Sequence, residues 1–197
     1  MEVMLELFQK IKLKLCKAFF ILLYSWSFKR FGKRSTMFFP FRVNGAKYVE
    51  IGDKVHINEG SWILALKSSE IDPILKIRSG TYIGRFSHIV SVENIDIGNN
   101  VLISDNVYIS DNLHHYKDVN IPIKDQGIKV TKEVRIGSNS WIGENVCVIG
   151  SSIGKHCIIG ANAVVTNDIP DFTVAVGSPA KVIKKYNHQL NKWEKIN

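Results

Sequence analysis

A six-residue period runs through the second half of the chain, and it constrains the fold more than any other feature. In most repeats a branched apolar residue is followed by a small or polar residue, and the repeats open at Ile97, Ile103, Ile109, Ile136, Ile142, Ile153 and Ile159. Amphipathic strands of a sandwich alternate with a period of two, so this pattern argues against that fold. A hexapeptide period is typical of a parallel β-helix. We therefore predict a mainly β chain coiled into a β-helix.

Each hexad is expected to supply one short strand and one corner. The opening Ile or Val should point inward, because β-branched side chains suit a packed, pleated surface. Gly, Asn and Asp at the corners tolerate a positive φ angle. Three hexads would make one triangular coil, so residues about 18 positions apart should stack. Ile136 and Ile153 are 17 positions apart, which predicts a one-residue deletion near Gly150.

The 197 residues are enough for about one domain. We expect an amphipathic helical segment over residues 1–35, with the helix itself over 1–31. A hexapeptide-repeat β-helix should cover residues 36–185, with regular turns beginning at Ile51 and an irregular stretch over 64–74. The period breaks over residues 115–133, and a long loop inside a compact solenoid is more often functional than accidental. Residues 186–197 should form a short helix or tail.

The N-terminal segment leaves two interpretations open. Apolar residues recur at three- and four-residue steps, as in Phe8, Ile11 and Leu15. The apolar run from 18 to 28 is shorter than the roughly 20 residues that a membrane span needs. Residues 1–31 could lie in a membrane interface or pack on the end of the solenoid. No small-residue cleavage site follows the apolar run, so we expect a cytoplasmic protein, either free or peripheral on the inner membrane face.

The net charge of +8 is concentrated at the two ends of the chain. A membrane surface at one end and a phosphorylated cofactor at the other would account for both clusters. No nucleic-acid-binding motif is visible, so no nucleic-acid partner is expected. The cysteines Cys16, Cys147 and Cys157 show neither metal nor disulfide spacing, which is consistent with a reducing compartment.

The second half of the chain resembles the hexapeptide-repeat acetyltransferases, in particular the galactoside, nodulation and surface-polysaccharide O-acetyltransferases. The similarity covers roughly residues 45–185 and is carried by the hexads from Ile136 to Asn145, by Ile159-Gly160-Ala161, and by the segments 165–170 and 177–183. The resemblance implies a left-handed β-helix assembled as a homotrimer, with active sites in grooves between subunits. It also implies acetyl transfer from acetyl-CoA, as co-substrate, to a sugar hydroxyl.

The same resemblance implies that His114 is the general base. The related string is Asp-His-x-His-Gly-Tyr, whereas this chain has Asp111 followed by Asn112, Leu113, His114, His115 and Tyr116. His115 replaces the glycine and remains the less favoured alternative. An imidazole suits the reaction because its pKa is close to neutral, so it can take a proton from a weakly nucleophilic hydroxyl. No cysteine or serine lies beside these histidines, so direct transfer is expected.

Further site residues are carried over from the family one position at a time. The resemblance implies that acetyl-CoA contacts Trp141, Ala161, Thr166, Asn167, Lys181 and Lys184. For each position a purely structural role is the alternative, such as filling a coil corner, forming a turn or belonging to a solvated basic tail. Asn112, Tyr116 and Asp118 are candidate contacts for the acceptor sugar. No metal is expected, because His88, His114 and His115 lack the spacing of a zinc site.

The predicted function is acetyl-CoA-dependent O-acetylation of a sugar, glycolipid or surface-polysaccharide precursor. One alternative is N-acetylation of a nucleotide-linked amino sugar. The other is a non-catalytic β-helix scaffold at the membrane surface. Binding of acetyl-CoA separates the two enzyme readings from the scaffold.

Overall fold

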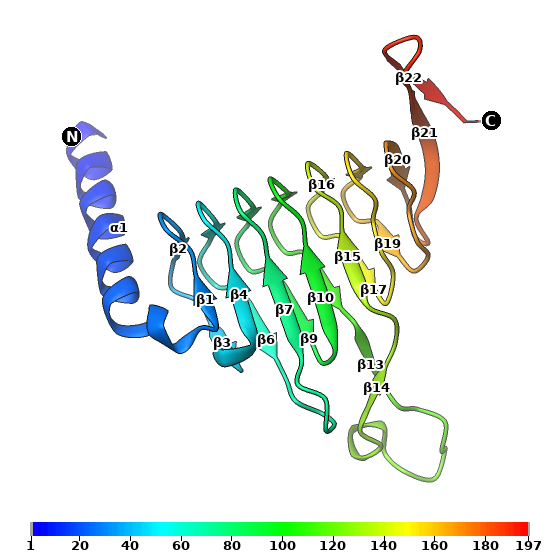
Figure 1. The fold of residues 1–197 in the computed structure, drawn as a ribbon, viewed down its shortest axis with the longest axis horizontal. Coiled ribbons are helices and arrows are strands. Elements are labelled where there is room, and N and C mark those ends of the chain that lie inside the picture. The colour runs from blue at the N-terminus through cyan, green and yellow to red at the C-terminus, as the bar shows by residue number, and fades with distance from the viewer. Residues whose placement is uncertain (1, 197) are drawn as a thin grey trace.

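The computed structural model describes residues 2–196. Its body is a column of coils in which three parallel sheets form the three faces, an arrangement typical of a left-handed β-helix (Figure 1). A helix, α1 (Glu2–Tyr24), lies at one end of the column, and antiparallel strands lie at the other. The mainly β fold predicted from the hexads is confirmed.

The chain visits the three faces in a fixed order, from sheet A to sheet B to sheet C. Sheet A contains β1 (Arg30–Phe31), β4 (Val49–Ile51), β7 (Ile74–Ile77), β10 (Asn94–Ile97) and β15 (Val134–Ile136). Sheet B contains β2 (Thr36–Met37), β5 (His56–Ile57), β8 (Tyr82–Ile83), β11 (Leu102–Ile103), β16 (Trp141–Ile142), β18 (Ile158–Ile159), β20 (Thr173–Val176), β21 (Lys181–Asn187) and β22 (Lys192–Lys195). Sheet C contains β3 (Arg42–Asn44), β6 (Trp62–Ala65), β9 (His88–Ser91), β12 (Tyr108–Ser110), β17 (Cys147–Ile149) and β19 (Val164–Val165).

The core is a stack of the residues that open the hexads. Ile77 pairs with Ile97, and Ile97 pairs with Ile136, so one isoleucine lies directly on the next. All three side chains are buried, and the corresponding isoleucines of sheets B and C are buried as well. Burial of each such side chain stabilises the fold by about 1.5–3 kcal/mol. The inward orientation predicted for the hexad isoleucines is confirmed.

The second hexad position is often glycine because neighbouring coils approach closely there. A Cβ atom added to Gly98 would lie 2.6 Å from the backbone nitrogen of Ser138 in the next coil. The corners themselves need a positive φ, which is 54° at Asn100 and 63° at Asn139. Asparagine adopts this conformation at lower cost than most residues. The predicted use of Gly and Asn at the corners is therefore confirmed.

Coil lengths differ from the predicted uniform value. Ile136 bridges to Ile153, as the predicted deletion requires. Earlier coils are longer, however, since Ile83 pairs with Ile103, twenty positions later. Longer corners absorb the extra residues without disturbing the inward stack.

The N-terminal part differs from the prediction. The helix ends at Tyr24, a 3-10 turn (η1, Ser25–Ser27) follows, and β1 begins at Arg30. The first coil therefore precedes Ile51 and lies partly inside the predicted helical segment. The hexad pattern missed this coil because Phe31 and Met37 take the inward places that Ile51 and Ile57 take one coil later. Among residues 2–196, no helix is both long and apolar enough to cross a membrane.

Two loops and the C-terminus are more ordered than predicted. The irregular stretch is confined to 66–73, between β6 and β7. The segment 115–133 belongs to an antiparallel hairpin of β13 (Asn112–His114) and β14 (Ile128–Val130), with a 3-10 turn (η3, Ile123–Asp125) near its tip. A further 3-10 turn, η2 (Ala46–Tyr48), joins β3 to β4. The C-terminus forms the hairpin β21–β22 instead of a helix or tail, and Tyr186 packs on Trp193 across it, with ring centroids 5.3 Å apart. Positions 1 and 197 of the predicted end segments lie outside the described residues.

Candidate active site

The hairpin β13–β14 is rooted in a buried carboxylate. Asp111 is fully buried, and its oxygens accept hydrogen bonds from the backbone amides of Val92, Glu93 and Asn94, at 2.9, 2.9 and 2.8 Å. The hydroxyl of Ser91 donates a further bond, at 3.1 Å. These donors belong to the corner of the preceding coil. A buried carboxylate with this many donors is well satisfied, so it fixes the point at which the chain leaves the solenoid.

His114 is the last residue of β13, and it lies on the hairpin three residues after Asp111. Its side chain is exposed, whereas that of His115 is half-buried. His114 pairs with Ile128 across the hairpin, and the backbone amide of His115 donates to the carbonyl of Gly127 at 3.1 Å. Within residues 2–196, neither imidazole has a hydrogen-bond partner.

The three candidate acceptor contacts occupy different environments. Asn112 is only 7% exposed, and its amide donates to the carbonyl of Val90 at 3.3 Å and to Asp111 at 3.2 Å. That burial places Asn112 in the root of the hairpin and argues against direct contact with a sugar. Tyr116 is exposed on the loop of the hairpin. Asp118 is also exposed, and Gln126 bonds to its backbone nitrogen and carbonyl oxygen.

Two of the predicted acetyl-CoA residues, Trp141 and Lys184, lie on the outer face of sheet B. Trp141 is 48% exposed and pairs with Ile158, which in turn pairs with Val174. Lys184 of β21 pairs with Val174, so it continues the same outward row. The indole nitrogen of Trp141 donates to the hydroxyl of Ser104 at 3.1 Å.

The remaining acetyl-CoA candidates are split between two edges of the solenoid. Ala161 lies exposed at the corner that leads from sheet B to sheet C, and Lys181 begins β21 beside Val176. Thr166 and Asn167 lie exposed at the corner that leads from sheet C back to sheet A. That second corner is also the edge from which the His114 hairpin leaves.

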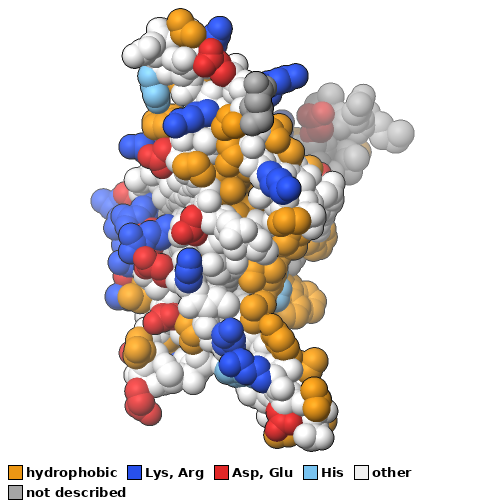
Figure 2. Space-filling view, turned by 90° about the vertical axis from the view of Figure 1, so that its right-hand side faces the viewer, with side chains coloured by type: hydrophobic (Ala, Val, Ile, Leu, Met, Phe, Trp, Pro, Cys, Tyr) orange, Lys and Arg blue, Asp and Glu red, His pale blue; other side chains and the backbone are white. Residues whose placement is uncertain are grey.

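The base and the Trp141 row therefore face in different directions within one chain. In a triangular coil, the edge between sheets C and A lies opposite sheet B. His114 starts from that edge, whereas Trp141 projects from sheet B. A single chain does not bring these two groups together. The charges also divide between faces, because Arg30, Glu50, Lys76, Asp96 and Arg135 follow one another on the outside of sheet A. In Figure 2, Lys and Arg side chains gather along one side of the view and hydrophobic side chains along the other.

Two residues of the site were not singled out from the sequence. In the sequence Asp111 is part of a motif string that does not mark it as an anchor, and Ser104 occupies an ordinary hexad position. A small signal exists for Asp111, because an acidic residue at the start of a long insertion is well placed to hold its root. No comparable signal marks Ser104, since its bond to Trp141 depends on the stacking of coils.

Among the described residues, no group of three or more His, Cys, Asp and Glu side chains could hold an ion. His156 lies at a corner of the solenoid, with a φ of 52°. His56 and His88 instead begin the strands β5 and β9. They lie on the outer faces of sheets B and C.

Comparisons with known proteins agree with this architecture. Residues 133–167 match the family described as bacterial transferase hexapeptide (six repeats). A probable acetyltransferase of Mycobacterium tuberculosis is 44% identical over 147 residues, which cover 74% of this chain and 46% of that protein. A candidate lipopolysaccharide biosynthesis O-acetyl transferase of Escherichia coli, WbbJ, is 41% identical over 121 residues, which cover 57% of this chain and 61% of WbbJ. The chain thus spans about half to three fifths of the length of these relatives.

Solved structures show the same fold. The maltose O-acetyltransferase from Clostridium difficile 630 is 28% identical, with a TM-score of 0.54, over 83% of this chain and 72% of that one. The N-acyltransferase AntD from Bacillus cereus, in complex with dTDP and 3-hydroxybutyryl-CoA, has a TM-score of 0.71 over 85% of this chain and 88% of its own. At 18% identity, the likeness to AntD concerns the fold alone. In sequence and fold the chain is thus similar to hexapeptide-repeat acetyltransferases.

Proposed function

We propose that this protein transfers the acetyl group of acetyl-CoA to a hydroxyl of a sugar, a glycolipid or a surface-polysaccharide precursor. The observation that carries the proposal is the 44% identity to a probable acetyltransferase over 147 residues. A stretch of that length in a 197-residue chain must include the coil that holds His114. The similarity to WbbJ, which is described as a lipopolysaccharide biosynthesis O-acetyl transferase, supports a polysaccharide precursor as the acceptor.

In this proposal His114 acts as the general base. Its imidazole takes the proton of the acceptor hydroxyl while that oxygen attacks the thioester carbonyl of acetyl-CoA. The tetrahedral intermediate carries an oxyanion, which a backbone N–H can stabilise. The carbon–sulfur bond then breaks, the acetyl ester remains on the acceptor, and the CoA sulfur leaves and is protonated. The exposed position of His114 on an anchored hairpin suits a base that meets substrates from solvent.

The split between the two faces supports a site shared by two copies of the chain. His114 of one copy would meet the sheet B row of the next copy, where Trp141 and Lys184 hold the acyl donor. Rotational symmetry repeats such a contact until the ring closes, and a trimer is the assembly that we propose. The hairpin β13–β14 extends away from the column (Figure 1), which would allow it to reach a neighbouring solenoid.

The test is a coupled measurement of free CoA across a panel of acceptors. Purified protein is mixed with acetyl-CoA, a thiol reagent and either a hydroxyl sugar, a polysaccharide fragment or a nucleotide-linked amino sugar. Wild type should release CoA only with a hydroxyl acceptor, and His114→Ala should lower that rate by about 10²–10⁴-fold. His115→Ala is the matched control, and it should keep most of the activity.

Each other outcome selects a different reading. Release only with the amino sugar would replace O-acetylation by N-acetylation. Release by His114→Ala at the wild-type rate would remove His114 as the base. Absence of both release and acetyl-CoA binding in titration calorimetry would favour the scaffold.

A further inference from the structure

The helix α1 presents its most apolar face to solvent. Met4, Phe8, Ile11, Leu15, Phe19 and Leu22 are spaced three or four positions apart, so they form one stripe along the helix, which we call the apolar stripe. These side chains are between 48% and 77% exposed. The helix is attached to the body by a different face. Phe20 packs there against Phe28 and Phe31, with ring centroids 6.3 and 5.9 Å apart.

Two lysines flank the apolar stripe. On a helical projection Lys12 lies on one side of the stripe and Lys14 on the other, whereas Lys10 and Lys17 lie on the opposite face of the helix. The acidic Glu6 projects away from the stripe and is 3.8 Å from Lys10. A helix with an apolar face bordered by lysines is suited to the interface of a membrane, where the apolar face enters the acyl region and the ammonium groups reach lipid phosphates.

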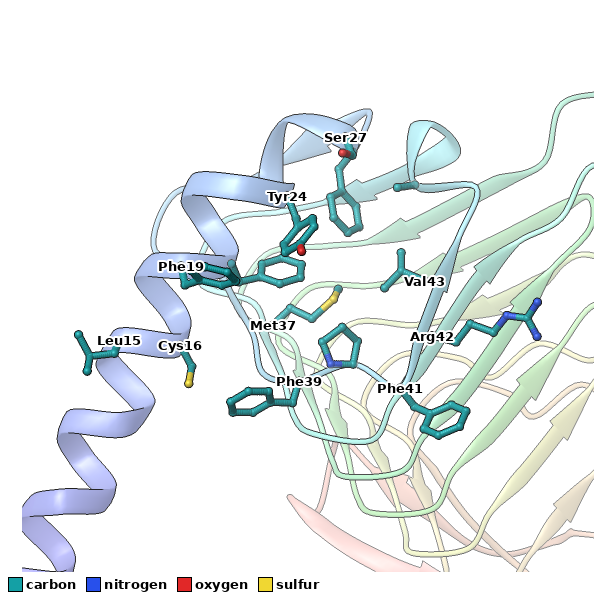
Figure 3. Close-up of a pocket in the computed structure, with 14 residues that line it drawn as sticks. Leu15, Cys16, Phe19, Tyr24, Ser27, Met37, Phe39, Phe41, Arg42 and Val43 are labelled. Atoms are coloured by element: carbon teal, nitrogen blue, oxygen red, sulfur yellow. The ribbon is translucent and has the colours of Figure 1, made fainter.

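An apolar pocket opens beside the stripe, between α1 and the first coil (Figure 3). Its volume is about 830 Å³, which lies within the range of small-molecule sites. Phe19 and Tyr24 from α1 and Met37 from β2 surround it. Leu15 and Phe19 belong both to the stripe and to the lining of the pocket. The two features are thus one continuous apolar surface.

We propose that α1 docks on an anionic lipid bilayer through the apolar stripe, and that a hydrocarbon chain of a bound lipid enters the pocket. The charge beside the apolar stripe favours an anionic bilayer over a second copy of the chain as its partner. Two copies paired through their stripes would bring Lys12 and Lys14 of each helix together, with no carboxylate on the flanks to offset them. An anionic bilayer complements the same lysines. The inference is independent of the proposed acetyl transfer.

The experiment is flotation of the full chain with vesicles of phosphatidylcholine alone, or with about one third phosphatidylglycerol added. Wild type should float with the anionic vesicles and remain behind with the neutral ones. Phe8→Glu places a charge in the stripe without touching the pocket lining, and it should lower binding by about tenfold or more. Leu190→Glu, a similarly exposed leucine in the turn between β21 and β22, is the matched control and should bind as wild type does.

Occupancy of the pocket can be measured through the reactivity of Cys16, which lines it. The variant Cys147→Ser removes the other partly exposed thiol among the described residues, so that modification reports on Cys16. Anionic vesicles should slow the modification of Cys16 by a thiol reagent several-fold, and neutral vesicles should not. Unchanged Cys16 reactivity on vesicles that bind the protein would overturn the pocket part. Absence of flotation, or equal flotation of Phe8→Glu, would overturn the docking. A Phe8→Glu protein that instead loses self-association would assign the stripe to a second copy.

Discussion

The carboxylate of Asp111 accepts a 2.8 Å hydrogen bond from the backbone amide of Asn94, at the corner where the preceding coil passes into the coil of Asp111. Asn94 opens β10, so the bond joins the start and the end of the same coil at the place where the hairpin leaves it. The side-chain amide of Asn94 donates to the carboxylate of Glu133, at 3.0 Å, where the chain returns from the hairpin. Both ends of the insertion are therefore tied to one residue, and the position of His114 depends on that tie.

Asp111→Ala should destabilise the fold and displace the proposed base. The change leaves the backbone amides of Val92, Glu93 and Asn94, which are buried or partly buried, without their acceptor, at a cost of about 3 kcal/mol. Thermal unfolding should show the loss, and CoA release should fall as well. Asp118→Ala, on the exposed part of the loop, should cost less than about 0.5 kcal/mol. Equal stability of the two variants would contradict the anchoring role of Asp111.

His88 makes stability depend on pH. It lies between Trp62 and Tyr108 on the outside of sheet C, with ring centroids 4.8 and 5.4 Å away, and burial lowers its pKa from the usual 6.5. Because the unfolded chain binds the proton more readily, the free energy of unfolding should fall as the pH drops through 6.5. The penalty should be absent well above that pH.

The variant His88→Phe keeps an aromatic ring between Trp62 and Tyr108 but has no side chain that can titrate. Its melting temperature should therefore fall less than that of wild type between about pH 7.5 and about pH 5.5. Other titrating groups are shared by the two proteins, so their difference isolates His88. A wild type and a variant with parallel pH profiles would show that His88 carries no such penalty.

Lys184 should contribute to acyl-CoA binding through the phosphates of the donor. It continues the row of Trp141 on sheet B. Lys184→Ala should raise the Kd for acetyl-CoA by roughly threefold to tenfold, with a smaller effect at high salt. Lys76→Ala, on the outside of sheet A, is the matched control and should leave the Kd unchanged. Equal effects of the two variants would show only a general influence of charge.

The sequence is sufficient to predict the solenoid because each inward isoleucine is determined locally. Ile136 and Ile142 open hexads whose next residue is glycine, and both are buried in the structure. The hexad pattern does not reveal the first coil, because Phe31 and Met37 replace the isoleucines. It does not reveal the C-terminal hairpin either, because the strands of that hairpin contain no hexad. In both places the sheet continues through pairing with a neighbouring strand, which a six-residue period does not encode.

The candidate site is predicted less completely than the fold. The exposed positions of His114, Tyr116 and Trp141 agree with contact to substrates. The burial of Asn112 was not foreseen, because the side chain is close in sequence to His114 but points into the root of the hairpin. Which residues share a face depends on the length of each corner. The separation of His114 from Trp141 could therefore be read only from the structure.

A shared site makes a quantitative prediction for mixed assemblies. If His114 of one copy works with the Trp141 row of the next, then His114→Ala inactivates one side of a site, and the double variant Trp141→Ala, Lys184→Ala weakens the other. With acetyl-CoA well below the Kd of the double variant, each homogeneous protein should be nearly inactive. After unfolding and refolding as an equal mixture, about one quarter of the sites should combine two intact sides, and that share of wild-type CoA release should return. Refolding either variant alone is the control. A mixture as inactive as its components would place both groups in the same copy, against the opposed faces of the solenoid.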